Sequence, residues 1–189
     1  MALAATVLVS GAACGADAPE AQLLVVDLIG KFRLAETRPA GAAFGLAQHT
    51  LGGHVRATLE VPVPSRIIWT IPVPRRGTLV LTPALAASTS SARVRFRAGV
   101  SDHRIYEGLA ETTVSAADGG VGPKWQIDLS SYAGFKWSLF YQPDRRVWRV
   151  VLNTEPADGA PTRALWVEPA IYTDVPAARH YLHERLTQR

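Results

Sequence analysis

The sequence predicts an all-β protein, an antiparallel β-sandwich of jelly-roll type with a short C-terminal helix. Two observations predict this fold. Apolar and polar residues alternate with a period of two through most of the chain after Leu23, as they do in strands that bury one face. Turn-forming residues separate these runs every ten residues or so, and the chain holds 15 glycines and 13 prolines. The sequence shows neither a βαβ rhythm nor an internal repeat.

The chain begins with an apolar segment that resembles a leader. Ala2–Ala13 is an apolar run of 12 residues. A helix needs about 20 apolar residues to span a bilayer, whereas a run of this length suits the apolar part of a signal peptide. Small residues lead up to Cys14, and this arrangement resembles the bacterial lipobox, in which the cysteine is lipidated. We therefore predict a leader and linker with lipidation at Cys14. Another exported form and a soluble cytoplasmic protein remain alternatives.

The first strands of the body are expected at Val55–Val61 and Ile67–Val73, where every second residue is apolar, and a third run surrounds Leu79. Before them, His49 and His54 flank a glycine pair. This segment is expected to be a surface loop. Two histidines in a surface loop are more often exposed to solvent than bound to a metal ion.

The clearest strand is Arg93–Val100. Its apolar residues all fall at even positions, and Arg93, Arg95 and Arg97 fall on the other face. This pattern predicts a half-buried strand with a basic outer face. Because arginine forms paired hydrogen bonds and stacks on planar groups, we expect these three arginines to contact a partner.

Five further strands are expected at residues 112–114, 125–129, 136–141, 147–153 and 164–172. Trp125 and Trp148 each share a face with apolar residues of their own strand, so both are expected in the core. Trp137 and Trp166 have apolar neighbours on both sides. They belong either to central buried strands or to an exposed contact surface, and we include both among the expected interaction residues.

The sequence of the last residues of the chain predicts one helix. Pro176 suits the first helical position, and the residues after it favour helix formation. The helix is basic, with Arg179 and Arg185 among its exposed residues, and both are expected interaction residues. The segment either packs on the sandwich as a tail or docks on a partner or an anionic membrane surface.

Several segments resemble galactose-binding-like jelly-roll domains, which are similar to carbohydrate-binding modules. The segments are residues 25–28, 96–102, 105–111, 124–134 (KWQIDLSSYAG) and 165–171. Within the fourth, Ser130 is expected to cap a short helical turn and Gly134 to leave it with a positive φ. The expected division of the chain is a leader and linker at residues 1–22, the β-sandwich at 23–173, and a basic helix or tail at 174–189.

Motifs of catalytic sites are absent from the sequence. It contains no serine hydrolase elbow, zinc protease motif, phosphate-binding glycine loop or dinucleotide fingerprint. The single cysteine excludes an intrachain disulfide. A net charge of +4 is too small to indicate a nucleic-acid binder. Asp102 or Asp128 could help to hold a structural calcium ion, but two aspartates do not define a site. We expect no catalysis, no cofactor and no metal site.

The expected function is that of a non-catalytic extracytoplasmic module, in the periplasm or at the cell surface. We predict a structural or interaction subunit that is tethered to a membrane through its N-terminus. It would dock on the protein subunits of a larger membrane complex, for which a respiratory or photosynthetic assembly is one possible host. The resemblance implies an alternative, a carbohydrate-binding module of the cell envelope with a glycan as partner. An enzyme is a third hypothesis.

Overall fold

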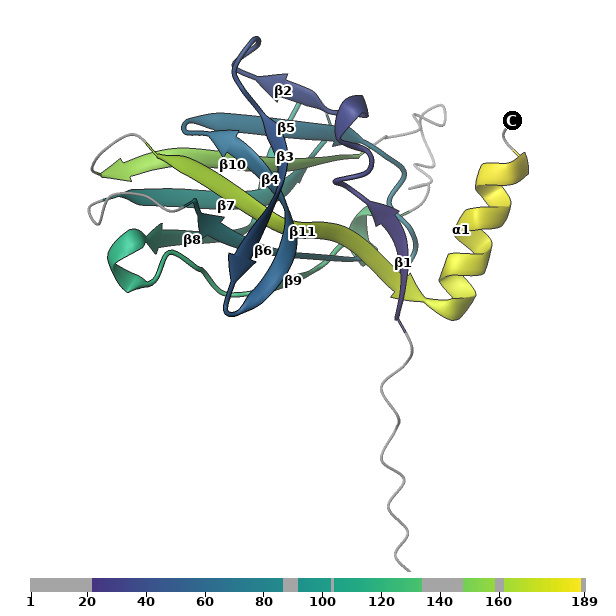
Figure 1. Cartoon of the computed structure of the whole chain (residues 1–189). Helices are drawn as coiled ribbons and strands as arrows, with labels where there is room; N and C mark the ends of the chain where they lie inside the picture. The colour runs from purple at the N-terminus through teal and green to yellow at the C-terminus, as the bar shows by residue number, and fades with distance from the viewer. Residues whose placement is uncertain (1–21, 87–91, 103, 134–147, 159–161, 188–189) are drawn as a thin grey trace, which may run out of the picture.

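The computed structural model describes residues 22–86, 92–102, 104–133, 148–158 and 162–187. Two antiparallel sheets pack face to face, and one α-helix follows the last strand (Figure 1). The predicted all-β sandwich with a short C-terminal helix is therefore confirmed. Cys14, Gly134, Trp137 and the expected strand at residues 136–141 lie outside the described residues.

The first layer, sheet A, has the strand order β3-β4-β11-β6-β9. Strand β6 pairs along one side of the long β11, and β4 and β1 share the other side. The strands are β1 (Gln22–Asp27), β3 (Gly45–Leu51), β4 (His54–Pro62), β6 (Thr78–Leu85), β9 (Trp125–Asp128) and β11 (Arg163–Asp174).

The second layer, sheet B, has the strand order β2-β5-β10-β7-β8. Its strands are β2 (Glu36–Arg38), β5 (Ser65–Thr70), β7 (Arg93–Ser101), β8 (Tyr106–Ser115) and β10 (Arg149–Asp158). Single 3-10 turns join some of the strands, namely η1 (Phe32–Leu34), η2 (Ala116–Asp118) and η3 (Ser130–Tyr132).

The core lies between the two sheets and is lined by the alternate residues that the period of two predicts. Phe96 of sheet B and Trp166 of sheet A are both fully buried there, with their rings 4.9 Å apart and close to perpendicular. This edge-to-face arrangement is the one that aromatic pairs prefer. Trp125 lies in the same core, as expected, and Trp148 packs against its edge.

The expected loop at residues 49–54 is wrong. His49 lies in β3, His54 begins β4, and the two strands form a hairpin in which Leu51 pairs with His54. Gly52 and Gly53 both have a positive φ, of 57° and 80°. Two successive positive φ angles make the tight turn that matches the twist of a hairpin, and glycine adopts them without steric cost.

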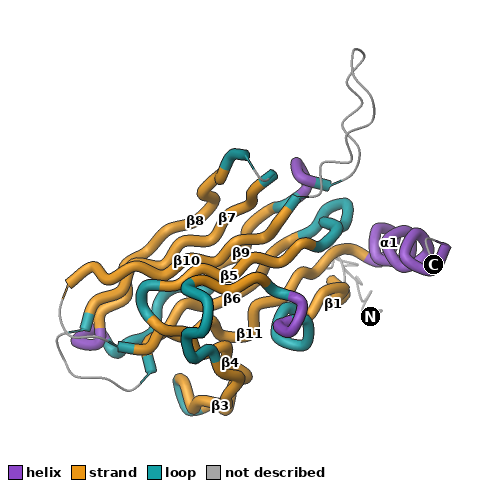
Figure 2. The backbone as a smooth tube through the Cα atoms, turned by 90° about the horizontal axis from the view of Figure 1, so that it is seen from above, coloured by secondary structure: helices purple, strands orange, loops and turns teal. Residues whose placement is uncertain are grey.

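Helix α1 (Val175–Thr187) begins one residue earlier than expected, so that Pro176 is its second residue. Asp174 caps the helix, because its Oδ1 accepts a hydrogen bond from Ala177 N at 2.8 Å. The helix closes one end of the sandwich, where Tyr181 belongs to the core (Figure 2). Among the described residues, no helix is long and apolar enough to span a bilayer.

The short turn after β9 is capped differently from the expectation. Ser130 begins η3, but its side chain makes no capping bond to the turn. Instead, Asp128 Oδ1 accepts hydrogen bonds from Ser130 N at 2.8 Å and from Ser130 Oγ. These bonds favour the carboxylate and lower the pKa of Asp128. Asp128 therefore closes the turn, as aspartate commonly does two residues before a bend.

Candidate functional site

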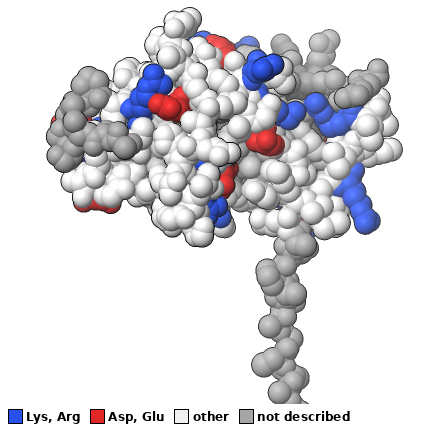
Figure 3. Space-filling model, viewed as in Figure 1, with Lys and Arg blue, Asp and Glu red and all other residues white. Residues whose placement is uncertain are grey.

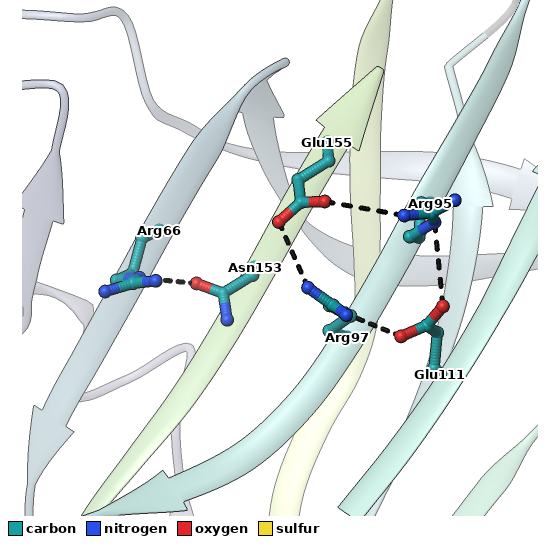
Figure 4. A network of polar contacts seen from close by, with 6 residues as sticks. All are labelled: Arg66, Arg95, Arg97, Glu111, Asn153 and Glu155. Carbon is teal, nitrogen blue, oxygen red and sulfur yellow. Dashed lines mark hydrogen bonds and ion pairs between the residues drawn. The ribbon is translucent and has the colours of Figure 1, made fainter. Parts of the chain in front are cut away.

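The outer face of sheet B carries a row of polar side chains that crosses four strands. Arg66 of β5 pairs in register with Asn153 of β10, Asn153 with Arg97 of β7, and Arg97 with Glu111 of β8. Arg66 Nε donates a hydrogen bond to Asn153 Oδ1 at 2.7 Å (Figure 4). Residues directly opposite on neighbouring strands share a face, so β-sheet register alone brings these side chains together.

Two arginines and two glutamates of this face form a closed ring of ion pairs (Figure 4). Arg97 Nε lies 2.6 Å from Glu111 Oε2, and Arg97 Nη1 lies 3.4 Å from Glu155 Oε1. Arg95 contacts the same carboxylates at 3.6 Å and 3.9 Å. The hydrogen bond and charge of Arg97 lower the pKa of Glu111, and Glu111 in turn raises the pKa of Arg97. Because the ring contains two arginines and two glutamates, it carries no net charge.

Beside the polar row lies an apolar row. Ile68 of β5, Val151 of β10 and Gly99 of β7 are in register on the same outer face, and all three are buried. The ring of Tyr106, from β8, covers Gly99. A Cβ atom on Gly99 would come within 2.8 Å and 2.9 Å of two Tyr106 ring carbons. We call these four residues, Ile68, Val151, Gly99 and Tyr106, the sheet B strip.

Two buried polar atoms beside the strip have no hydrogen-bonding partner in good geometry, Tyr106 Oη and Arg149 Nε. Arg149 precedes Val151 on the same face of β10, and its Nη1 lies 3.6 Å from Glu36 Oε2. Burial raises the pKa of Tyr106, while the neighbouring Asn153 and Arg97 act in the opposite direction. Tyr106 Oη therefore lies on the side of the polar row.

Such orphaned atoms are uncommon, because buried polar groups in folded proteins are almost always hydrogen-bonded. A tyrosine hydroxyl can both donate and accept, and an arginine Nε–H donates. Above these buried groups, the half-buried Tyr106 and the exposed Arg66 can contact a small ligand that has an apolar face and hydroxyl groups at its edges.

The residues predicted from the sequence do not form one site. Arg93, Arg95 and Arg97 lie on the outer face of sheet B, where Arg93 Nη1 pairs with Asp158 Oδ2 at 3.1 Å. Trp166 is fully buried, so the structure gives it a packing role within the core. Arg179 and Arg185 are exposed on a different element, helix α1.

The sequence analysis missed Tyr106, Arg149 and Asn153. One signal was present, because an isolated glycine within a strand, such as Gly99, often marks a place where another group approaches the backbone closely. The signal does not say which residue approaches.

Metal binding finds no support in the described residues. No group of three or more His, Cys, Asp or Glu side chains in this part of the chain could hold an ion. Asp102 Oδ1 accepts hydrogen bonds from Arg104 N and Ile105 N, so its carboxylate helps to close the turn after β7. Asp128 acts in the same way at η3, as described above.

Comparison with known proteins shows similarity in fold. No family model and no curated protein matches the chain. Two similar solved structures contain CBM51-2 and INT domains from Clostridium perfringens ZmpB, and in one of them CBM51-2 is in complex with GlcNAc. Their sequences are 13% and 12% identical to this chain, with TM-scores of 0.52 and 0.51. Each match covers 74% of this chain but only 30% and 29% of the other.

A third similar structure is the K1 cleaved adhesin domain of Lys-gingipain from Porphyromonas gingivalis W83. It is 11% identical, with a TM-score of 0.49, and the match covers 74% of this chain and 90% of that domain. The two structures that contain CBM51-2 confirm the expected resemblance to galactose-binding-like, carbohydrate-binding-module-like domains at the level of the fold.

Proposed function

We propose that this chain is a non-catalytic glycan-binding module and that the outer face of sheet B, around the half-buried Tyr106 and the exposed Arg66, is its binding face. The observation that carries the proposal is the half-buried Tyr106 beside the hydrogen-bonded pair of Arg66 and Asn153 on this face. The fold shared with CBM51-2 supports this alternative of the sequence analysis better than its main expectation.

The chemistry of the strip suits a sugar ring. A pyranose presents apolar C–H groups on its faces and hydroxyl groups around its edge. Aromatic rings and apolar side chains contact such faces, while a few fixed polar groups orient the ligand. Tyr106 supplies the ring, and Arg66 and Asn153 supply planar hydrogen-bonding groups that already hold one another in place. Tyr106 is half-buried, so part of its surface stays accessible on this face.

The test is a glycan array with the full chain, including GlcNAc-containing glycans, followed by calorimetry with the tightest ligand. Tyr106→Phe removes only the hydroxyl, and Tyr172→Phe is the matched control on sheet A. Loss of one hydrogen bond of 0.5–1.5 kcal/mol corresponds to about 2-fold to 12-fold weaker binding. We expect that loss for Tyr106→Phe and none for Tyr172→Phe. Equal weakening by both variants, or by neither, would place the ligand elsewhere, and an empty array would refute glycan binding.

The sequence predicts that the protein is a subunit of a membrane protein complex, and this role stays a prediction. Its expected contact arginines on β7, Arg93, Arg95 and Arg97, are all engaged in ion pairs, and no described feature selects a protein partner. The extracytoplasmic location and the tether at Cys14 are likewise proposals. Affinity purification from native membranes, with mass spectrometry of the co-purifying proteins and of the N-terminus, tests all three.

A further inference from the structure

Exposed leucines gather at one end of the molecule. Nine large apolar side chains are exposed in the described part of the chain, and five of them belong to β1, η1 or α1. These five are Leu23, Leu24, Leu34, Leu182 and Leu186. Figures 1 and 2 show α1 beside β1 at this end, and η1 follows β1 along the chain. Surface leucines that occur singly need no explanation, but a group of them marks an interaction site.

The same end is basic. Its exposed or half-buried cations are Lys31, Arg33, Arg75, Arg76, Arg179 and Arg185. The hydroxyl of Thr173 donates to the carbonyl oxygens of Arg75 and Arg76, which places these two arginines beside the start of α1. Of the carboxylates on these elements, Asp174 forms an ion pair with Arg76 at 2.8 Å, and Glu184 lies 3.1 Å from His180. On the face drawn in Figure 3, Lys and Arg likewise gather toward the α1 end.

We propose that this leucine-rich basic end docks on the surface of an anionic phospholipid bilayer. Leucines inserted among the headgroups and cations facing anionic lipids are the two contributions that hold amphipathic elements in a membrane interface. Each cation near such a surface strengthens binding by up to about fivefold.

Two observations favour a bilayer over a protein partner. The cores of protein interfaces are rich in aromatic side chains, whereas the large apolar side chains exposed here are all leucines. In addition, the chain enters the sandwich at β1, which forms part of this end. The segment before β1 contains the apolar run Ala2–Ala13, the leader expected to lie at a membrane. A bilayer that holds this run would face Leu23 and Leu24 first.

The experiment is flotation of the full chain with vesicles of phosphatidylcholine alone or with phosphatidylglycerol at about one third of the lipid. Every variant keeps the run Ala2–Ala13, so the difference between the two lipid mixtures isolates the proposed surface. The charge variant is Arg179→Gln with Arg185→Gln. Its control has the same net charge and replaces two arginines of other elements, Arg93→Gln with Arg163→Gln.

The apolar variant is Leu182→Ser with Leu186→Ser, whose side chains are 54% and 71% exposed. Its control is Leu46→Ser with Val55→Ser on the β3–β4 hairpin, at 55% and 65% exposed. Because all four side chains are largely exposed, we expect every variant to fold, and its melting temperature checks this.

We expect the wild type to bind anionic vesicles more tightly than neutral ones and to lose that preference as salt rises. The charge variant should bind anionic vesicles up to about fivefold more weakly per arginine removed, and the apolar variant should also bind them more weakly. Both controls should match the wild type. Equal binding of patch and control variants, or indifference to phosphatidylglycerol, would overturn the proposal. So would a wild type that ignores vesicles but crosslinks through this end to a membrane protein.

Discussion

Gly99 is the residue on which the outer face of sheet B depends most directly. It lies where the register of β7 against β8 shifts, and Tyr106 covers it. A Cβ atom at this position would come 2.1 Å from the carbonyl oxygen of Glu107. A backbone atom cannot move aside as a flexible side chain can, so no other residue fits without distorting the strand.

We predict that Gly99→Ala destabilises the fold by about 1–3 kcal/mol or more, the range for forcing an extra methyl group into a packed site. Gly108→Ala, on the neighbouring strand, is the control, because its new methyl group would meet nothing closer than 3.7 Å. It should stay within about 0.5 kcal/mol of wild type. Urea unfolding of the three proteins measures the difference, and similar midpoints would show that the Glu107 carbonyl and Tyr106 do not approach Gly99 this closely.

A second prediction at this scale concerns Tyr132 in η3. Burial, and then the neighbouring Glu107 carboxylate, raise the pKa of Tyr132 to about 12. In the unfolded chain this group ionises near pH 10. Between these values the unfolded state loses the proton and the folded state keeps it, so stability falls as pH rises from 10 to 12.

Tyr132→Phe removes the ionisable hydroxyl and with it this loss of stability at alkaline pH. The melting temperature of the variant should therefore fall less between pH 9 and pH 12 than that of the wild type. At pH 7 the comparison reports only the lost hydroxyl. If the melting temperatures of the two proteins fall in parallel over the alkaline range, the raised pKa of Tyr132 is contradicted.

Among the elements, helix α1 depends on a capping residue that the sequence analysis did not single out. Asp174 accepts the Ala177 N–H bond, and its Oδ2 lies 2.8 Å from Arg76 Nη1. The Ala177 bond first, and then Arg76, lower the pKa of Asp174. Because the folded pKa is depressed, the stabilisation is complete above the unfolded value near 4 and is lost as pH falls through the lower folded value.

We therefore predict that Asp174→Ala lowers the melting temperature at pH 7. The difference in melting temperature between the variant and the wild type should disappear below pH 4. Asp158→Ala provides the control, since its exposed pair with Arg93 should contribute little. Circular dichroism melts between pH 2 and pH 7 measure both. An unchanged gap at pH 2 would mean that the effect does not come from the carboxylate.

At the scale of the whole molecule, the two sheets and α1 share one core. Phe96 comes from sheet B, Trp166 from sheet A and Tyr181 from the helix, and all three belong to the same buried cluster. A second, small buried cluster of Ala84, Leu165 and Val167 lies on the other face of sheet A, and β6 and β11 contribute to both clusters. Small domains of this kind unfold in one cooperative transition.

We predict that helical circular dichroism and tryptophan fluorescence report the same unfolding midpoint. Phe96→Ala should lower the free energy of unfolding by about 3–5 kcal/mol. The midpoint should therefore fall by the same amount for both signals. Leu46→Ala, at an exposed position of β3, is the control and should leave both unchanged. A helix signal that unfolds before the fluorescence would show that α1 is a separate unit.

Much of the fold could be predicted because alternation reports directly on burial. In β7 the apolar residues at even positions lie in the core, as expected. Strand β3 could not be predicted in this way. Its exposed and half-buried residues alternate without a fully buried one, so its sequence carries no apolar face. The pair Gly52-Gly53 was the available signal for the hairpin.

The candidate site could be predicted only in part. The arginines of β7 were expected on an outer face, but their acidic partners Glu111 and Glu155 were not. These glutamates lie on β8 and β10, and the sequence does not say which strands neighbour β7. Trp166 shows the same limit. Its strand is buried on both faces because sheet B covers the side of Trp166, while Ala84, Leu51 and Ala86 pack against Leu165 and Val167 on the other side.

The sequence by itself determined the fold class, the two faces of the clearest strand and the presence of a C-terminal helix, because each follows from the spacing of neighbouring residues. Only the tertiary structure decided the strand order and register, which bring Arg66, Asn153, Arg97 and Tyr106 onto one face. The physical reason is that a period of two fixes which way a side chain points. Which strands lie beside it depends on how all of the apolar faces are buried at once.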